Sequence, residues 1–188
     1  MDQDDIELII KAKSGDLESF DLIVVRYLKS IFNFTYRLTN SRDDADDTTQ
    51  ETFLKVWKNL RSFDINKNFK TWLFTIARNT VTDLFRKKKS IPSSFFDNND
   101  GENPLLNNLS DTEPLPDQLI SMAEDKKLLE DMLNKIPISY KEVLLLRYIE
   151  DLTFEEISEA LGRPSNTIRS QHKRGLLLLR KLLTTATK

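Results

Sequence analysis

The feature that most limits how this chain can fold is a central segment, residues 91–118, that contains no Lys, Arg or His. It holds four of the six prolines and a cluster of Asn, Asp and Ser, a composition that buries too little apolar surface to form a core. We therefore expect an acidic flexible linker at 91–118 between two small domains, residues 1–90 and 119–188. Each is long enough for a small helical bundle. With only 4 glycines in the chain, a loop-rich sandwich or barrel is disfavoured and an all-α fold is expected.

Two cationic segments interrupt an otherwise acidic chain of net charge −2. Residues 52–90 carry ten basic and two acidic side chains, and residues 163–188 carry seven basic and none acidic. Local fields of this kind favour a polyanionic partner that is contacted at two places. Two solvated helix faces that are basic for no functional reason are the alternative.

Composition also excludes several kinds of site. The chain has no Cys and a single His, His172, so thiolate metal sites, multi-His metal centres and Cys nucleophiles are excluded. We expect no catalytic site, metal or cofactor. No apolar run approaches the roughly 18 residues of a membrane span, and the acidic start at 1–5 has the wrong sign for a signal peptide. We expect a soluble cytoplasmic protein without stable membrane insertion.

Apolar residues that recur every three or four positions predict helices over 4–13, 16–38, 43–60 and 69–88. The 43–60 helix has a polar face on which Leu54 lies among acids and amides. An apolar residue in such a face is typical of an interface, although a solvated face with one stray leucine gives the same pattern. The residues of this face that we single out are Asp47, Gln50, Glu51 and Leu54.

The 69–88 helix has an outer strip of hydroxyl, amide and guanidinium groups. Such groups donate hydrogen bonds to phosphates and base edges. Aromatic residues gather around this basic helix, including Phe63 in the predicted loop 61–68, and unpaired bases stack on such rings. Core packing is the alternative role, above all for Phe69 and Trp72. The outer strip comprises Thr71, Thr75, Arg78, Asn79, Thr82 and Arg86.

The second domain carries the sharper local signals. Helices are predicted over 119–135 and 139–149, and Pro137 ends the first of them. Thr153 and Glu156 form a capping box, which Leu152 and Ile157 flank as a hydrophobic staple. That helix ends at Gly162, and Ser165 is expected to cap a basic helix from 166 to about 183.

Two helices joined by a short Gly-containing turn form a helix-turn-helix, with a plain helical hairpin as the alternative. The second helix presents polar and basic side chains near its N-terminus, as reading a major groove requires. His172 is expected to pack or to contact a phosphate.

Several motifs, in this order, resemble the regions of bacterial sigma factors. Residues 44–57 (DADDTTQETFLKVW) resemble region 2.2, and residues 69–79 (FKTWLFTIARN) with 83–87 (DLFRK) resemble regions 2.3 and 2.4. The resemblance to region 4 lies in Ile136-Pro137, Leu146-Arg147, residues 155–157, Leu161-Gly162 and residues 166–170. With two domains and only a linker between them, the chain resembles the extracytoplasmic-function (ECF) group of the sigma-70 family.

The resemblance implies a protein that binds core RNA polymerase, recognises the −35 and −10 promoter elements and promotes DNA melting. The clamp coiled coil of polymerase would dock on Asp47, Gln50, Glu51 and Leu54. The single-stranded −10 element would contact Ser62, Phe63, Asp64, Lys70, Thr71, Arg78, Asn79, Thr82 and Arg86. In this set Phe63 is the aromatic candidate for capturing a flipped base. The −35 duplex would contact Asn166, Thr167, Arg169, Ser170, Lys173 and Arg174.

The resemblance also implies a partner, an anti-sigma factor, because the chain lacks the extended autoinhibitory N-terminal region of housekeeping sigma factors. Gln171 stands where many relatives carry Arg. Two other functions compete with this interpretation. An autonomous helix-turn-helix regulator leaves the polar face of the 43–60 helix unused. A nuclease would need the acids of residues 43–47 to converge on a metal, whereas they lie on several faces of one helix.

Overall fold

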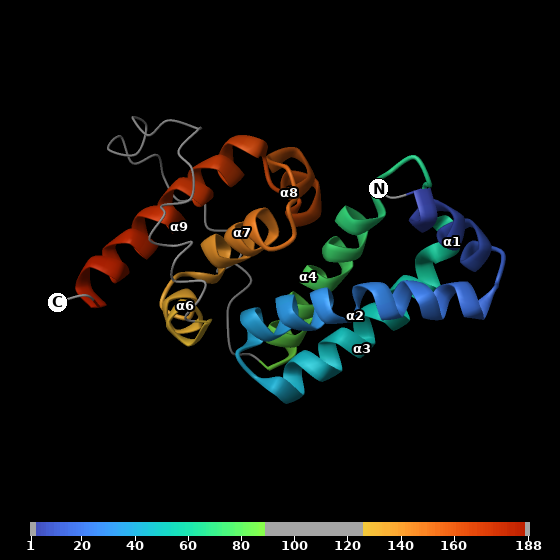
Figure 1. Cartoon of the computed structure of the whole chain (residues 1–188), viewed down its shortest axis with the longest axis horizontal. Coiled ribbons are helices and arrows are strands. Elements are labelled where there is room, and N and C mark those ends of the chain that lie inside the picture. The colour runs from blue at the N-terminus through green and yellow to red at the C-terminus, as the bar shows by residue number, and fades with distance from the viewer. Residues whose placement is uncertain (1–2, 89–125, 187–188) are drawn as a thin grey trace. The chain divides into compact units, whose positions relative to one another are not determined.

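A computed structural model describes residues 3–88 and 126–186, which confirm the all-α fold: these residues contain helices and turns but no strand (Figure 1). They divide into two compact units, which we describe separately. Of the described residues, the first unit comprises 3–88 and Glu159–Gly162, and the second comprises 126–158 and 163–186. The predicted linker at 91–118 lies outside the described residues.

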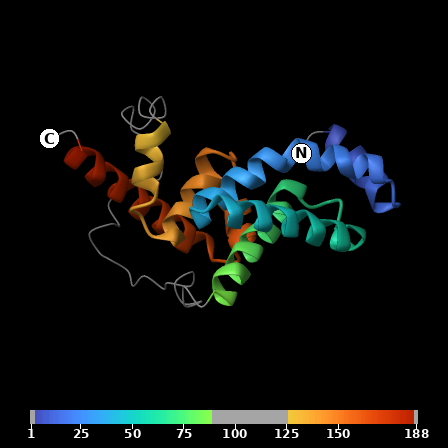
Figure 2. The same ribbon diagram turned by 90° about the horizontal axis from the view of Figure 1, so that it is seen from below.

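The helices of the first unit follow the predicted ranges to within one or two residues. α2 packs against α1, α3 and α4, and α3 packs against α4. α2 and α3 lie side by side in both views (Figures 1 and 2). The predicted loop 61–68 differs in one respect, since its start is wound into a single 3-10 turn, η1. The elements are α1 (Gln3–Lys13), α2 (Leu17–Thr39), α3 (Arg42–Asn59), η1 (Leu60–Ser62) and α4 (Phe69–Lys87).

Polar side chains define where α3 and α4 begin. The Ser41 side chain accepts a hydrogen bond from the backbone N–H of Asp44 at 3.3 Å. Asn68 Oδ1 accepts one from the backbone N–H of Thr71 at 3.2 Å. Each cap satisfies a backbone donor that a helix N-terminus leaves without an intrahelical acceptor. The chain therefore leaves the η1 loop at Asn68 in a defined direction.

Apolar residues from α2, α3 and α4 form the core of the first unit. Ile31 and Phe34 of α2 are buried, and Phe34 meets Phe74 of α4 edge to face with ring centroids 5.2 Å apart. Where α2 meets α3 the core is polar, since Thr35 and Thr49 are buried and their hydroxyl oxygens lie 3.1 Å apart. Both oxygens thus have a hydrogen-bond partner, as buried polar atoms require.

The predicted helix-turn-helix is present, and all of it except Glu159–Gly162 belongs to the second unit. Of the predicted 119–135 helix, α6 covers part, and residues 119–125 lie outside the described residues. The predicted cap at Ser165 is wrong by one residue, because the helix already includes Ser165 and its first backbone bond runs from the N–H of Ile168 to the carbonyl of Pro164. The elements are α6 (Lys126–Leu133), α7 (Ile138–Tyr148), α8 (Phe154–Leu161) and α9 (Ser165–Ala186).

The predicted capping box is confirmed. The backbone N–H of Glu156 donates to Thr153 Oγ1 at 3.2 Å, and the Glu156 carboxylate accepts from the backbone N–H of Thr153 at 2.8 Å. Leu152 and Ile157, the predicted staple, are both buried. Gly162 follows α8 with φ of +63°, a conformation that favours glycine and ends the helix.

A buried ion pair fixes the turn before α9. The guanidinium of Arg163, in this turn, lies 2.5 Å from the carboxylate of Glu142 on α7, and Glu142 is fully buried. Arg163 also donates to the side-chain oxygen of Gln171 on α9 at 3.1 Å. Removing two charges from water costs free energy, and the attraction between the closely spaced Arg163 and Glu142 offsets that cost.

We predict that Arg163→Met lowers the free energy of unfolding of the second unit by about 3–5 kcal/mol, because it leaves the Glu142 carboxylate buried without its cation. Urea unfolding of the full chain, followed by far-UV circular dichroism, measures the effect. Adding Glu142→Leu should recover most of the loss. A stable Arg163→Met single variant would contradict the assignment of this pair.

Candidate functional site

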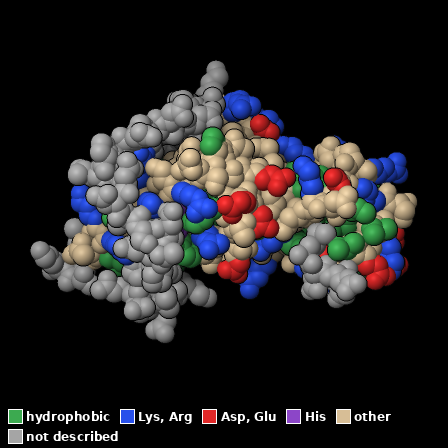
Figure 3. Space-filling model, turned by 90° about the horizontal axis from the view of Figure 1, so that it is seen from above, with side chains coloured by type: hydrophobic (Ala, Val, Ile, Leu, Met, Phe, Trp, Pro, Cys, Tyr) green, Lys and Arg blue, Asp and Glu red, His purple; other side chains and the backbone are tan. Residues whose placement is uncertain are grey.

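An open apolar groove of about 820 Å³ runs between α2 and α3. Leu54 of α3 and Val25 of α2 remain 54% and 73% exposed at its edge. Exposed apolar surface that is gathered in one groove marks a contact site for another molecule. The remaining lining residues are Leu17, Phe20, Val24, Leu28, Lys29, Phe32, Arg42, Asp46, Thr49, Gln50, Phe53 and Trp57. On the face drawn in Figure 3, hydrophobic side chains gather at the surface on the right of the view, beside charged side chains of both signs.

The groove contains half of the predicted polymerase face. Gln50 and Leu54 line it, whereas Asp47 is exposed outside it and Glu51 pairs with Lys55 on the same helix at 3.2 Å. The sequence interpretation missed the contribution of α2. The sequence does carry a signal for this contribution. Beside the apolar residues of α2 that form the core, a second row of apolar residues recurs in helical steps at Leu17, Val25, Leu28 and Phe32.

The outer strip of α4 is only partly as predicted. Asn79 and Arg86 are exposed, and Arg78 and Lys70 are half-buried. Arg78 donates to the Asn79 side-chain oxygen at 3.5 Å, and Lys70 lies over the Phe74 ring at 6.0 Å. The strip therefore presents guanidinium and amide groups, and Lys70 adds an ammonium group on the same helix.

The structure corrects the strip at two threonines, Thr71 and Thr82, which are buried. The hydroxyl of Thr82 donates to the carbonyl of Arg78 at 2.9 Å, within its own helix. A threonine that bonds the preceding turn has no proton left for a phosphate. The hydrogen-bonding groups of α4 are therefore chiefly its cations and Asn79.

The expectation for Phe63 also needs correction. Its ring is only 4% exposed and packs against Phe69 and Trp72, with centroids 5.5 and 4.7 Å away. The backbone carbonyl of Phe63 accepts a hydrogen bond from Lys13 of α1. The 3-10 turn that precedes Phe63 directs its ring into the core, so in this structure the ring offers no open face to a base.

The rest of that loop is exposed and ordered by its own polar groups. Ser62 donates to the carbonyl of Asn59 at 2.8 Å, and Asp64 accepts from both the backbone and the side-chain N–H of Asn66 at 3.0 Å. These hydrogen bonds, the backbone one first, hold the pKa of Asp64 below its usual value. Ile65 is the exposed apolar side chain here, at 41%.

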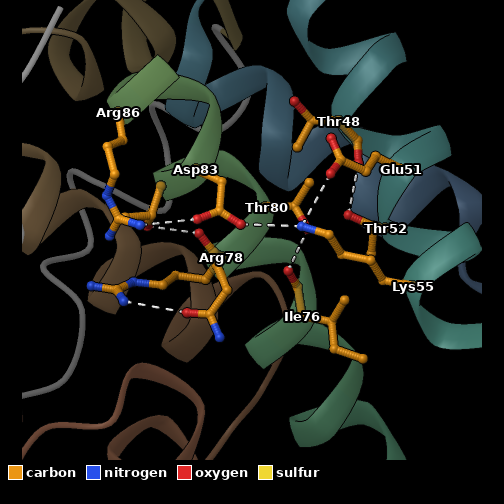
Figure 4. A network of polar contacts seen from close by, with 11 residues as sticks. Thr48, Glu51, Thr52, Lys55, Ile76, Arg78, Thr80, Asp83 and Arg86 are labelled. Atoms are coloured by element: carbon orange, nitrogen blue, oxygen red, sulfur yellow. Dashed lines mark hydrogen bonds and ion pairs between the residues drawn. The ribbon is translucent and has the colours of Figure 1, made fainter. Parts of the chain in front are cut away.

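A network of charged groups, none of which lines the groove, links α3 to α4 (Figure 4). Lys55 Nζ lies 3.2 Å from Glu51, from Thr80 and from Asp83. Partial burial of the ammonium opposes its protonation, but hydrogen bonds to Glu51 and Asp83 outweigh this and raise the pKa of Lys55. Asp83 in turn lies 3.4 Å from Arg86.

The basic helix α9 presents the predicted polar residues at its start. Asn166 is exposed, and the other candidates, Thr167, Arg169, Ser170, Lys173 and Arg174, are half-buried. The guanidinium of Arg169 lies over the Phe154 ring at 4.8 Å and pairs with Glu155 at 3.1 Å. α8 therefore orients a candidate DNA-contacting side chain of α9.

Two neighbouring residues of α9 face inward. His172 is buried, meets the Tyr148 hydroxyl at 2.9 Å and packs against Phe154, which confirms a packing role. Burial raises the pKa of Tyr148. Gln171, 2% exposed, accepts from Arg163. Gln171, which stands where many relatives carry Arg, thus contacts the turn before α9.

Acidic residues at the start of α3 form ion pairs with different cations. Asp44 pairs with Lys88 at 2.6 Å, and Asp46 lies 3.9 Å from Arg42. Within residues 3–88 and 126–186, no three acidic or imidazole side chains gather as a metal ion would require. In the same residues, no helix is both long enough and apolar enough to cross a membrane.

Comparison with known proteins identifies both units. Residues 23–91 match the family model of Sigma-70 region 2, and residues 126–179 match that of Sigma-70, region 4. The ECF RNA polymerase sigma factor SigW of Bacillus subtilis is 34% identical over 186 residues, which cover 95% of this chain and 98% of the relative. The ECF RNA polymerase sigma-E factor of Haemophilus influenzae is 30% identical, with coverages of 89% and 88%.

Solved structures agree with this assignment. The sigma factor RpoE of Bartonella quintana, in complex with the anti-sigma factor NepR, is 26% identical and aligns over 89% of this chain and 98% of that chain, with a TM-score of 0.67. CnrH, in complex with the cytosolic domain of CnrY, shares the fold at 22% identity, with a TM-score of 0.69 over 97% and 99% of the two chains. With both sigma regions in order and a relative matched along nearly its whole length, the chain belongs to the ECF group of sigma-70 family RNA polymerase sigma factors.

Proposed function

We propose that this sigma factor binds core RNA polymerase through its first unit, opens the −10 element on α4 and reads the −35 element with α9. Residues 1–90 and 119–188 act as the two functional domains, and 91–118 joins them. One observation carries the proposal: α3 lies between an apolar groove and a cationic strip, so one small unit offers both a protein-binding and a strand-binding surface. An autonomous regulator has no use for either surface.

The polymerase-binding surface is the groove with Gln50 and Leu54. An apolar groove between two helices suits a helical partner that inserts a row of apolar side chains. A coiled coil, as in the polymerase clamp, presents such rows. Asp47 and Glu51 lie outside the groove and act at its rim, where charges govern orientation and association rate more than affinity.

Promoter opening requires no catalytic chemistry from this chain, and we propose that it has no enzymatic activity. The protein has to hold unstacked bases and their backbone more tightly than the duplex does, against an unstacking cost of a few kcal/mol. Arg78, Asn79 and Arg86 hold the strand, with Lys70 contributing charge. Ser62, Asp64 and the exposed Ile65 form the loop beside it. Because the Phe63 ring is buried, we assign it the role of supporting this loop.

The −35 duplex is read by the start of α9, with Asn166, Thr167 and Ser170 near its N-terminus and Arg169, Lys173 and Arg174 supplying cations. A helix presented in this way fits the major groove. The solved complex of RpoE with an anti-sigma factor supports a partner of the same kind for this chain.

Reconstituted transcription tests the proposal. The purified chain is mixed with bacterial core RNA polymerase and a promoter library, and the transcript starts are sequenced. Discrete starts that need both components are expected. If none occur while the chain alone binds duplex DNA specifically, the autonomous-regulator function replaces this proposal.

We predict that Arg78→Ala and Arg86→Ala each weaken open-complex formation about five- to tenfold, because each removes a charge-assisted contact to the strand. Permanganate reactivity of unpaired thymines measures opening. Polymerase affinity, measured separately by fluorescence anisotropy, should be unchanged. An equal loss of polymerase affinity would show that Arg78 and Arg86 do not contribute to DNA opening separately from polymerase binding.

For the groove, Leu54→Glu combined with Gln50→Ala should weaken polymerase binding by roughly 30-fold or more, because a carboxylate is brought into an apolar contact. Anisotropy with labelled protein measures the affinity. Leu22→Glu is the matched control, since Leu22 is 55% exposed on α2 but does not line the groove. Comparable losses in the two variants would rule out the groove as the docking site.

At the −35 element, Lys173→Ala or Arg174→Ala should relax the preference at one or two base pairs by about 1–3 kcal/mol per lost base contact. Transcription from a library randomised in the −35 region measures the preference position by position. A uniform loss across all sequences would instead assign these residues to phosphate contacts.

A further inference from the structure

A single acid interrupts the cationic helix α4. Between Phe69 and Lys87 the helix carries Lys70, Arg78, Arg86 and Lys87, and its one carboxylate is Asp83. Asp83 lies three positions before Arg86, which is proposed to hold the −10 strand. A carboxylate at this distance repels phosphate, so its presence on a strand-binding helix needs a physical reason.

Each oxygen of Asp83 has a cation of its own (Figure 4). Oδ2 lies 3.2 Å from Lys55 Nζ of α3, and Oδ1 lies 3.4 Å from Arg86 Nη1 of α4. Asp83 thus stands between a lysine that belongs to the neighbouring helix and the arginine that faces the proposed strand.

Lys55 is held in place by groups from two helices. Besides Asp83, its ammonium contacts the Glu51 carboxylate and the Thr80 hydroxyl, both at 3.2 Å. Thr80 is buried and donates its own proton to the carbonyl of Ile76 at 2.8 Å, so its oxygen is free to accept from Lys55. The Lys55 side chain is 32% exposed. A partly buried cation with three fixed acceptors is less mobile than a surface lysine.

The Arg86 side chain, by contrast, is 66% exposed, and its guanidinium pairs with Asp83 of the same helix. A long exposed side chain loses rotamer freedom when it binds a phosphate, and ordering it beforehand reduces that loss. Asp83 can supply this order because residues three apart on a helix are neighbours.

We propose that Asp83 is a positioning residue for promoter opening: anchored and partly neutralised by Lys55, it orders the guanidinium of Arg86 for contact with the −10 strand. The inference rests on the proposed function of α4. Lys55 is shared between Asp83 and Glu51, so the charges of the four groups, Arg86 included, sum to zero, and Lys55 offsets part of the negative charge of Asp83 beside Arg86.

The opposite effect defines the alternative. If Asp83 merely competes with phosphate for Arg86, its removal strengthens strand binding. If it orders Arg86, its removal weakens strand binding. The sign of the change in DNA affinity on Asp83→Asn therefore separates the two.

The experiment uses the assembled complex of core polymerase with the full chain. The probe is a promoter recovered from the transcription assay above, opened as a preformed bubble and labelled on its non-template −10 strand. Affinity is measured by anisotropy for the wild type and for Asp83→Asn, Lys55→Met, Lys55→Arg and Lys58→Met. The variants Asp83→Asn, Lys55→Met and Lys55→Arg are also each combined with Arg86→Gln, and these double variants are compared with Arg86→Gln alone. Thermal unfolding of each variant verifies that it folds.

Asp83→Asn and Lys55→Met should each weaken bubble binding about two- to fivefold, the range of an exposed ion pair. Lys55→Arg, which keeps the cation, should restore most of the affinity. Lys58→Met is the matched control, because it removes an exposed cation three residues further along α3 and should leave affinity near the wild type. In the Arg86→Gln background, Asp83→Asn and Lys55→Met should cause no further loss.

Two results would overturn the inference while leaving the proposed function intact. One is stronger bubble binding by Asp83→Asn. The other is a loss that persists undiminished in the Arg86→Gln background, which would show that Lys55 and Asp83 merely hold α3 to α4. An absence of transcripts that depend on the chain would instead overturn both the proposed function and this inference.

Discussion

Both candidate surfaces of the first unit depend on the close packing of α3 between α2 and α4. The first part of the inward side of α3 is built of small residues, with Ala45, Thr48, Thr49 and Thr52 all buried, and the larger Phe53 and Val56 are buried after them. The threonine hydroxyls are satisfied locally: Thr52 donates to the carbonyl of Thr48 at 2.7 Å, and Thr49 meets Thr35 of α2. Small side chains let neighbouring helices approach, and satisfied hydroxyls avoid the cost of buried unpaired polar atoms.

Close packing on the inward side leaves the two edges of α3 for different tasks. At one edge, Leu54 and Gln50 complete the groove with α2. At the other, Lys55 reaches across to Asp83 and Thr80 of α4. Residues one position apart on a helix point in different directions, so neighbouring residues of one short motif serve a polymerase surface and a strand-binding surface. This separation makes it possible to test the two functions independently.

The second unit reaches its function by other means. Its turn is set by local signals, namely the capping box at Thr153, the left-handed Gly162 and the buried pair of Arg163 with Glu142. Together they fix the direction in which α9 leaves the turn. A recognition helix needs this rigidity, because base contacts lose their energy when the helix axis shifts.

The sequence by itself determined most of the helix ranges, the capping box at Thr153 and the family. Periodicity and capping are local properties of a chain, so the ranges of α2 to α4 and the box at Thr153 were correct to within a residue or two. The structure alone decided which side chains share a surface. In the structure Phe63 and Thr71 are buried, and α2 supplies half of the residues that line the groove. Lys55 of α3 also pairs with Asp83 of α4. These outcomes depend on the packing of one helix against another, and a helical wheel gives the direction of a side chain without giving the neighbour that covers it.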